Sequence, residues 1–253
     1  MQTLSTIEQL DEKIRECAAA PSDAALRELF ATFRMETPVT HSDPFSGAYA
    51  REQMALYEQI SGRTYRLENE ETQFDVDELV SRPFPYCTGS LQVVGDQFVA
   101  IGSLLRHMKV PMGGRILEFG PGHGNTTLAL AQAGYQMTAV DVEARFCNLI
   151  QRRAARNGVD IEVVNSDFMW AEQVLEPYDA VIFFECFHHC ADHLRLLQAL
   201  QTAIKPGGKI YFAGEPITEE FPVPWGIRLD GESLWAIRKH GWLELGLDRK
   251  SVV

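Results

Sequence analysis

The sequence predicts an α/β protein in which a doubly wound, mostly parallel sheet follows an N-terminal helical cap. From Arg115 onward, short apolar runs alternate with helical patterns, which is typical of repeated strand–helix units. Residues 181–184 have no polar alternation, as a central strand covered on both faces requires. Three closely spaced glycines follow the first apolar run and precede a helical pattern. Together these observations predict a sheet whose carboxyl edge approaches a ligand.

The expected strands and helices alternate along the second half of the chain. The strands are residues 115–119, 136–141, 161–164, 178–184 and 209–213. The helices between them are residues 126–133, 144–157, 169–175 and 192–204. Residues 205–208, Lys-Pro-Gly-Gly, are expected to form a turn, because proline and glycine end a helix and lead into a strand. A helix at 231–239 and a strand-like run at 242–247 follow.

The first ninety residues have a different texture. Apolar residues recur at helical spacing in three short stretches, at residues 7–14, 26–33 and 49–60. The proline-containing segment 81–90 favours an extended, irregular path. We therefore divide the chain into a helical cap region, residues 1–90, and a sheet domain, residues 91–253. The cap either shapes a substrate pocket or forms a packing surface, which leaves a homo-oligomer open.

Composition argues against several classes of partner. The chain has 253 residues and a formal net charge of −12, which disfavours nucleic acid and anionic membrane surfaces. Its longest apolar runs, such as residues 180–184, are far shorter than the roughly 20 residues that span a bilayer. The N-terminus has acidic residues and no apolar signal core, and the five cysteines are odd in number. We therefore expect a cytoplasmic protein without disulfides, nucleic-acid binding or membrane insertion.

A glycine-rich turn after the first strand carries the main functional signal. Residues 116–127 read Ile-Leu-Glu-Phe-Gly-Pro-Gly-His-Gly-Asn-Thr-Thr. Gly120, Gly122 and Gly124 let the backbone turn tightly and approach a ligand, and the following helix presents its first N–H groups. This pattern predicts a nucleotide-like cofactor, and a tight turn without a ligand is the alternative.

Polar residues follow the other strands at the same edge, where open α/β sheets bind ligands. Asp141 ends the second strand twenty-three positions after Glu118, where a carboxylate reaches the hydroxyls of a ribose. Asp167 and Phe168 follow the third strand and are expected to border an adenine. Glu185 follows the fourth strand and is also assigned to cofactor binding.

This combination resembles the class I S-adenosylmethionine-dependent methyltransferases over about residues 92–247. The family's acidic residue followed by G-x-G-x-G matches residues 118–124, and Lys-Pro-Gly-Gly before the fifth strand is also typical. The resemblance implies a Rossmann-like sheet of seven strands, S-adenosylmethionine as cofactor, and transfer of its methyl group. It also implies that Glu118 engages the ammonium of the cofactor, while Asp141 holds the ribose and Asp167 the adenine.

A finer resemblance concerns residues 184–192, 215–216 and 224–235. These segments are similar to bacterial methyltransferases associated with glycosyltransferases that build surface polysaccharides. The resemblance implies a small-molecule or carbohydrate acceptor methylated at oxygen, with a glycosyltransferase as a possible partner. Trp225 and Trp235 could then stack on a sugar face, or they could fill a core.

His188, His189 and Glu215 are the candidate catalytic residues. A hydroxyl acceptor loses its proton as it attacks the methyl carbon, and neutral imidazole accepts protons near pH 7. Glu215 could orient or deprotonate the acceptor. The alternatives are that the histidines pack on the cofactor or cap a helix, and that Glu215 is a solvated loop residue. We expect no metal, because Cys186 and Cys190 flank a strand–loop junction and a sulfonium methyl group is electrophilic without one.

Two other functions stay open. A nicotinamide-binding oxidoreductase shares this kind of sheet, but its fingerprint is G-x-G-x-x-G, and here the third glycine comes one position early. The second is a cofactor-binding partner module of a glycosyltransferase, without turnover of its own. Members of the family end in a β-hairpin, whereas only one strand-like run, residues 242–247, stands near the end of this sequence.

Overall fold

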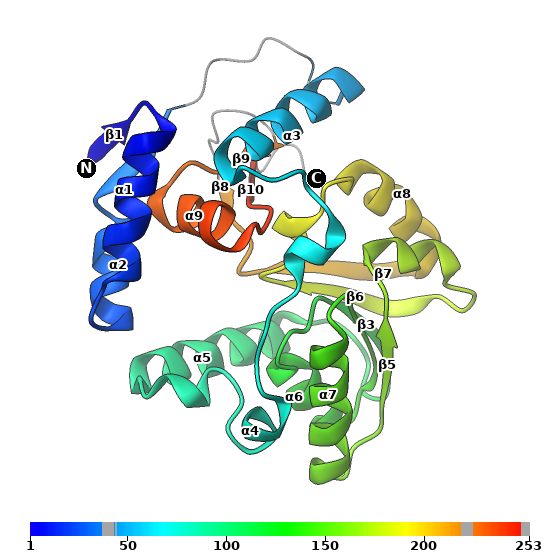
Figure 1. The fold of residues 1–253 in the computed structure, drawn as a ribbon. Helices are drawn as coiled ribbons and strands as arrows, with labels where there is room; N and C mark the ends of the chain where they lie inside the picture. The colour runs from blue at the N-terminus through cyan, green and yellow to red at the C-terminus, as the bar shows by residue number, and fades with distance from the viewer. Residues whose placement is uncertain (37–42, 44, 219–224, 249–253) are drawn as a thin grey trace. The chain divides into compact units, whose positions relative to one another are not determined.

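The computed structural model describes residues 1–36, 43, 45–218 and 225–248. The chain packs as two compact units (Figure 1). The terminal unit consists of Met1–Glu70 together with Pro216–Val253, and the sheet unit consists of Glu71–Glu215. The predicted boundary at residue 90 differs from this division. Residues 71–90 belong to the unit that contains the sheet, and the described residues after 215 belong to the unit that contains the N-terminal helices.

The sheet unit contains a five-stranded parallel sheet with the order β5-β4-β3-β6-β7. The strands are β3 (Arg115–Phe119), β4 (Gln136–Asp141), β5 (Ile161–Asn165), β6 (Tyr178–Phe184) and β7 (Ile204–Ala213). The chain runs outward from β3 to β5 and then returns to the other side of β3, so the sheet is doubly wound. The predicted Rossmann-like fold class is therefore confirmed.

Helices alternate with these strands as expected. They are α5 (Leu91–His107), α6 (Asn125–Gln132), α7 (Ala144–Asn157) and α8 (His193–Ala203). Right-handed crossovers place α6 and α7 on one face of the sheet and α8 on the other. The helix predicted at residues 169–175 is a 3₁₀ helix, η3 (Phe168–Gln173), and not an α-helix.

Both faces of the sheet are covered by apolar side chains. Ile116 and Ile182 pack on one face with Leu104 of α5 and Leu130 of α6. On the other face, neighbouring strands bring Phe119, Phe183 and Phe212 into a stack, with ring centroids 5.3 and 5.5 Å apart. Residues 181–183 are fully buried, which explains why this stretch shows no polar alternation.

Two features of the sheet differ from expectation. Strand β7 begins at Ile204, so residues 205–208 lie within its bounds and not before it. The pairing of β6 with β7 jumps from Tyr178↔Ile204 to Ala180↔Lys209, and Gly207 has a φ of 80°, as the predicted Pro-Gly turn requires, so these residues interrupt the pairing. The sheet also has five strands among the described residues, whereas the family resemblance implied seven, since β8 (Ile217–Thr218), β9 (Trp225–Ile227) and β10 (Leu245–Asp248) form a separate sheet.

The terminal unit joins segments from both ends of the chain. Its N-terminal elements are β1 (Gln2–Leu4), α1 (Ile7–Ala18), α2 (Asp23–Phe30), β2 (Phe33–Met35), α3 (Gly47–Ser61) and η1 (Leu67–Glu70). Its later elements are β8 (Ile217–Thr218), β9 (Trp225–Ile227), α9 (Gly231–Trp235), η5 (Ala236–His240, a π-helix) and β10 (Leu245–Asp248). The three helical stretches predicted near the N-terminus are confirmed as α1, α2 and α3. Each begins after a Thr or Ser whose hydroxyl accepts a backbone N–H.

Helix α3 holds the C-terminal segment by polar contacts from three of its side chains. The hydroxyl of Tyr49 donates to the carbonyl of Trp225, and the hydroxyl of Tyr57 donates to the carbonyl of Gly241. The backbone N–H of Ile227 donates to the side-chain oxygen of Gln53 at 2.9 Å. Tyr49, Tyr57 and Gln53 are all buried. These long-range contacts assign residues 225–241 to the terminal unit, which no local sequence pattern indicates.

Residues 71–90 belong to the sheet unit and contain α4 (Val76–Ser81) and η2 (Tyr86–Thr88). Helix α4 packs against α7, where Arg152 forms an ion pair with Asp77.

No helix in the described part of the chain is both long and apolar enough to cross a membrane.

Candidate functional site

The candidate site lies in the sheet unit, where the loops after β3, β4, β6 and β7 meet at the carboxyl edge. The loop between β3 and α6 contains Gly120, Gly122 and Gly124, with φ angles of 55°, 51° and 72°. These left-handed conformations are costly for residues with a Cβ atom, so the loop requires glycine. Gly124 immediately precedes α6 and provides no side-chain cap for the helix. The predicted close approach of backbone to ligand is therefore possible here.

The surroundings of the three glycines differ. A Cβ atom at Gly120 would lie 2.6 Å from the Cβ of Cys186, and one at Gly124 would lie 2.6 Å from the Cγ1 of Ile150. A Cβ atom at Gly122 would meet no atom within 4 Å. Gly120 and Gly124 therefore allow the loop to pack against the protein, while Gly122 faces open space.

Glu118 lies at the end of β3, directly before this loop. Its side chain is 1% exposed, and its Oε2 accepts a hydrogen bond of 2.6 Å from the hydroxyl of Thr127 in α6. Its Oε1 has no hydrogen-bond donor among the described residues. Burial raises the pKa of Glu118 to about 7, although the Thr127 bond favours the charged form. A buried carboxylate oxygen without a donor is well suited to a cationic ligand.

Asp141 ends β4 and ties the loop to the sheet. Its Oδ2 accepts the N–H of Gly122 at 3.0 Å, and its Oδ1 accepts the N–H of Glu143 at 2.9 Å. Burial raises the pKa of Asp141 to about 7 despite these two hydrogen bonds. Each carboxylate oxygen can accept a further hydrogen bond, so hydroxyl groups of a ligand could still donate to it.

Asp167 and Phe168 follow β5, as predicted. The Oδ1 of Asp167 accepts the N–H of Met169 at 2.9 Å and so caps η3. The ring of Phe168 lies 5.8 Å from that of Phe119 and 6.0 Å from that of Phe183. Phe168 is therefore half-buried against the aromatic face of the sheet, and only part of it is available to a ligand.

Glu215 organises the turn after β6. Its Oε1 accepts the N–H groups of Cys186 and Phe187, both at 2.8 Å. Its Oε2 accepts the N–H of His188 at 3.1 Å and lies 2.8 Å from Nδ1 of the same residue. The carboxylate is 1% exposed, so it is not a solvated loop residue. Because the carboxylate can only accept, Nδ1 carries the proton when the ring is neutral, and Nε2 carries the acceptor lone pair.

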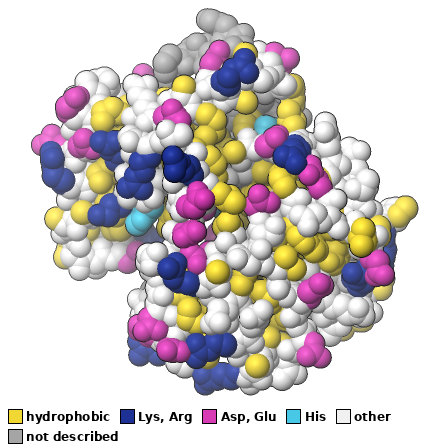
Figure 2. All heavy atoms as spheres, turned by 45° about the vertical axis from the view of Figure 1, so that its right-hand side comes forward, with side chains coloured by type: hydrophobic (Ala, Val, Ile, Leu, Met, Phe, Trp, Pro, Cys, Tyr) yellow, Lys and Arg dark blue, Asp and Glu magenta, His cyan; other side chains and the backbone are white. Residues whose placement is uncertain are grey.

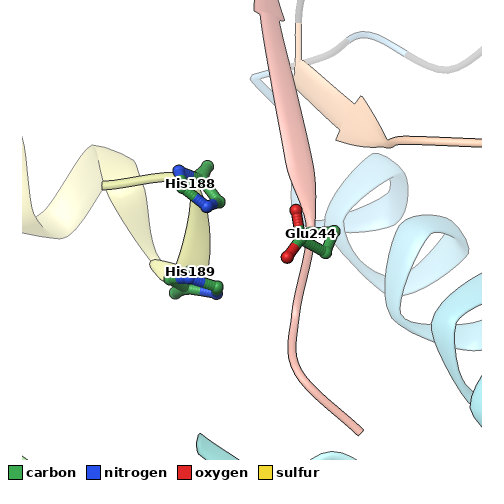
Figure 3. A group of neighbouring side chains, drawn as sticks. All are labelled: His188, His189 and Glu244. Carbon is green, nitrogen blue, oxygen red and sulfur yellow. The ribbon is translucent and has the colours of Figure 1, made fainter. Parts of the chain in front are cut away.

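His188 and His189 lie side by side on η4 (Phe187–His189), with ring centroids 4.2 Å apart (Figure 3). His188 is buried and His189 is half-buried. Glu244, which Figure 3 also labels, comes from the terminal unit. Both histidines thus stand at the carboxyl edge, as predicted, and Nδ1 of His188 lies 2.8 Å from Oε2 of Glu215.

Glu185 is exposed and has a φ of 53°, which lies in the left-handed region that residues other than glycine rarely adopt. Its backbone N–H donates to the carbonyl of Ala213 in β7. A Cβ atom on the neighbouring Gly214 would lie 2.5 Å from the Cγ of Glu185, so glycine there makes room for this side chain. Strained backbone of this kind is concentrated at functional sites, which is consistent with the predicted role of Glu185.

Three residues of this region escaped the sequence analysis. Thr127 lies in the first turn of α6, and its hydroxyl donates to Glu118 at the end of β3, a contact between a helix and a strand that no local spacing predicts. Glu143 is an acid two positions after Asp141 and caps α7, where it accepts the N–H groups of Arg145 and Thr72. Arg153 donates to the carbonyl of His123 across the space between α7 and the loop, and no local pattern predicts that contact.

The chain matches known proteins over this region. Residues 116–208 match the family model described as a methyltransferase domain. A ubiquinone biosynthesis O-methyltransferase of Xanthomonas axonopodis pv. citri (strain 306) is 30% identical over 105 residues, 41% of this chain and 44% of that protein. The one of Idiomarina loihiensis (strain ATCC BAA-735 / DSM 15497 / L2-TR) is 29% identical over 117 residues, 46% of this chain and 48% of that protein. The chain thus spans about half the length of these curated relatives.

Solved structures with a similar fold include coclaurine N-methyltransferase bound to N-methylheliamine and SAH. It has 17% identity and a TM-score of 0.49, and the match covers 83% of this chain and 58% of that chain. Another is an S-adenosylmethionine-dependent methyltransferase from Thiobacillus denitrificans in complex with S-adenosyl-L-homocysteine, with 18% identity, a TM-score of 0.41 and 56% of each chain covered. Residues 116–208 thus match a methyltransferase domain in sequence, and they contain strands of the doubly wound parallel sheet.

Proposed function

We propose that this protein transfers the methyl group of S-adenosylmethionine to a hydroxyl group of a small-molecule or carbohydrate acceptor. The observation that carries this proposal is Glu118, whose buried carboxylate keeps one oxygen without a donor among the described residues, directly before a loop of left-handed glycines. This arrangement fits a ligand that combines an ammonium group with an adenosine. The match of residues 116–208 to methyltransferase domains gives the reaction class.

The residues at the edge fit the cofactor part by part. Glu118 would hold the ammonium, because a cation compensates the desolvation of a buried carboxylate. Gly122 leaves the adjoining space open, and Asp141 keeps acceptor capacity for the ribose hydroxyls. Asp167 and Phe168 would border the adenine, and Glu185 extends the polar edge. When bound, the cofactor supplies an electrophilic methyl group on its sulfonium.

His188 is the residue we assign as the general base. An acceptor hydroxyl becomes a good nucleophile as its proton moves to Nε2 of His188, while Glu215 holds the proton on Nδ1 and stabilises the imidazolium that forms. Glu215 is therefore a positioning residue, and His189 is the alternative base. Positioned proton transfer of this kind contributes roughly 10²–10⁴-fold in rate. The remainder would come from alignment of the acceptor with the methyl group, which can be worth ~7–11 kcal/mol.

The choice of oxygen and of a small acceptor has separate support. A base that removes a proton is needed for a hydroxyl, whose pKa is high, more than for a neutral amine that attacks through its lone pair. The curated relatives over this region are O-methyltransferases. The formal net charge of −12 disfavours a nucleic-acid substrate, and Figure 2 shows acidic as well as basic side chains on the face that it draws. A carbohydrate acceptor and a glycosyltransferase partner follow only from the finer resemblance of residues 184–192 and 224–235.

Calorimetric titration with S-adenosylmethionine, S-adenosylhomocysteine and NAD tests the cofactor, with Asp141→Ala as the variant. We expect the two adenosyl ligands to bind at micromolar concentration, NAD not to bind, and Asp141→Ala to weaken binding at least tenfold. Binding of NAD alone would overturn the proposal in favour of an oxidoreductase. Transfer of a labelled methyl group to hydroxyl compounds, beginning with sugars, then separates a methyltransferase from a partner module that binds cofactor without turnover.

A further inference from the structure

Arg153 lies on α7, is 8% exposed, and contacts the far end of the glycine loop. Its Nη1 donates to the carbonyl oxygen of His123 and, at 2.9 Å, to Oδ1 of Asn125. These acceptors flank Gly124, whose φ of 72° sets the direction in which the loop enters α6. A single guanidinium nitrogen thus donates hydrogen bonds to the residues on both sides of Gly124.

The same two loop residues, His123 and Asn125, also contact the segment 71–90. The side-chain amide of Asn125 donates to the carbonyl of Phe84. The ring of His123 lies 6.0 Å from that of Phe74, 5.2 Å from that of Phe84 and 5.0 Å from that of Phe146 in α7. Burial lowers the pKa of His123 to about 4, so this ring packs as a neutral group at physiological pH. The loop is therefore clamped between α7 and the segment 71–90.

Burying the charge of Arg153 costs free energy of folding. Its acceptors are a backbone carbonyl and an amide oxygen, both neutral, and its Nε and Nη2 have no acceptor among the described residues. Burial lowers the pKa of Arg153 to about 10, which reflects the cost of desolvating the cation. No carboxylate among the described residues contacts Arg153 to offset this cost, so its role lies in the hydrogen bonds that it donates to the loop.

The other end of the loop is fixed by different contacts. The N–H of Gly120 donates to the carbonyl of Val140, and the N–H of Gly122 donates to Asp141. The peptide groups around Gly124 lack such a bond to the sheet, and Gly124 N–H donates within the loop, to the carbonyl of Pro121. Without Arg153, these peptides could rotate, and the first N–H groups of α6 would lose their direction toward the edge.

We propose that Arg153 is a positioning residue for cofactor binding, which holds the loop from Gly122 to Asn125 in its ligand-binding conformation through the His123 carbonyl and the Asn125 side chain. This inference rests on the proposed function, because the loop is the expected cofactor loop. Arg153 does not contact the reacting atoms in this proposal. It acts through the backbone that surrounds the cofactor.

The test compares Arg153→Met with Arg152→Met in the full chain. Arg152 is the matched control, because it lies on the same helix and joins the same segment through Asp77 at 2.6 Å, but it is solvent-exposed. Three quantities are measured for each variant: the melting temperature, the Kd for S-adenosylhomocysteine by calorimetry, and amide hydrogen exchange in peptides that cover residues 120–128. The exchange experiment uses the ligand-free protein.

We expect Arg153→Met, at a temperature where it is fully folded, to bind S-adenosylhomocysteine at least tenfold more weakly, with faster exchange at residues 120–128. Arg152→Met should match the wild type in all three. Unchanged affinity in Arg153→Met would overturn the inference. If that variant does not fold, Arg153→Lys replaces it, since a single ammonium reaches both acceptors poorly, and wild-type affinity there would also overturn it. If the wild type itself binds no S-adenosylhomocysteine, the proposed function fails instead, and unchanged exchange would then refute the clamp independently.

Discussion

At the scale of single residues, the two buried carboxylates of the site set a response to pH. Glu118 and Asp141 each have a pKa of about 7 in the folded protein, raised by burial from ordinary values near 4. The folded state therefore holds protons that the unfolded chain has already released. The stability that these protonated groups provide is present below about pH 4 and is lost as the pH rises to about 7.

The variant Glu118→Gln tests this assignment. An amide cannot ionise, so we expect the melting temperature of ligand-free Glu118→Gln to fall less between pH 5 and pH 8 than that of the wild type. The same variant should bind S-adenosylhomocysteine at least tenfold more weakly, because the ammonium loses its carboxylate. Glu176→Gln, the same change at an exposed side chain, is the control. Parallel pH profiles for all three proteins would show that Glu118 does not titrate as described.

A second residue-scale prediction separates the two histidines. In His188→Asn, the amide nitrogen can still donate to Glu215, but the base is gone, so methyl transfer should slow by roughly 10²–10⁴-fold. The affinity for S-adenosylhomocysteine should not change. His189→Asn is the matched variant, with an expected loss of less than tenfold. Single-turnover rates with labelled cofactor measure both, and a larger loss in His189→Asn would transfer the role of base to that residue.

At the scale of elements, the glycine loop combines three positions with the same backbone requirement and different surroundings. In Gly124→Ala, the new Cβ meets Ile150 in addition to the left-handed strain of roughly 1–2 kcal/mol. In Gly122→Ala, only the strain remains, and the methyl group enters the open space. We expect Gly124→Ala to lower the melting temperature more, and Gly122→Ala to weaken S-adenosylhomocysteine binding at least tenfold. Thermal melts with calorimetry check this order, and the reverse order in the melts would contradict it.

Element boundaries also show where local sequence is informative. The bounds of β3, β4, β6 and α7 are as predicted, because long apolar runs and a strong helical period leave one interpretation. The start of β7 at Ile204 was not predicted, because local sequence does not show which strand this residue pairs with. Pairing with Tyr178 and Ala180 decides this case.

At the scale of the whole molecule, one unit is assembled from both ends of the chain. Tyr57 is fully buried, donates to the carbonyl of Gly241, and accepts from the side chain of Asn69 at 3.0 Å. Tyr57→Phe leaves both partners without this hydroxyl, at a cost of about 1–3 kcal/mol in the stability of the terminal unit. The sites in the sheet unit should be unaffected.

Urea unfolding followed by tryptophan fluorescence measures this effect, since Trp225, Trp235 and Trp242 belong to the terminal unit and only Trp170 belongs to the sheet unit. We expect a lower midpoint in Tyr57→Phe and an unchanged Kd for S-adenosylhomocysteine. Tyr86→Phe removes the hydroxyl of a tyrosine that is 46% exposed, and serves as the control. An equal loss of stability in both variants would argue against the role of the Tyr57 hydroxyl.

The sequence alone determined the parallel sheet, the bounds of β3, β4 and β6, and the edge at which Glu118, Asp141 and Glu215 lie. Apolar periodicity and glycine spacing are local properties, and the carboxyl ends of parallel strands necessarily share one edge. Tertiary structure decided the contacts between distant residues: the hydrogen bonds of Glu215 with Cys186, Phe187 and His188, the bonds from Arg153 to the glycine loop, and the contacts of α3 with residues 225–241. These contacts depend on long-range packing, because the residues that form them lie far apart in the sequence and no local spacing predicts that they come together.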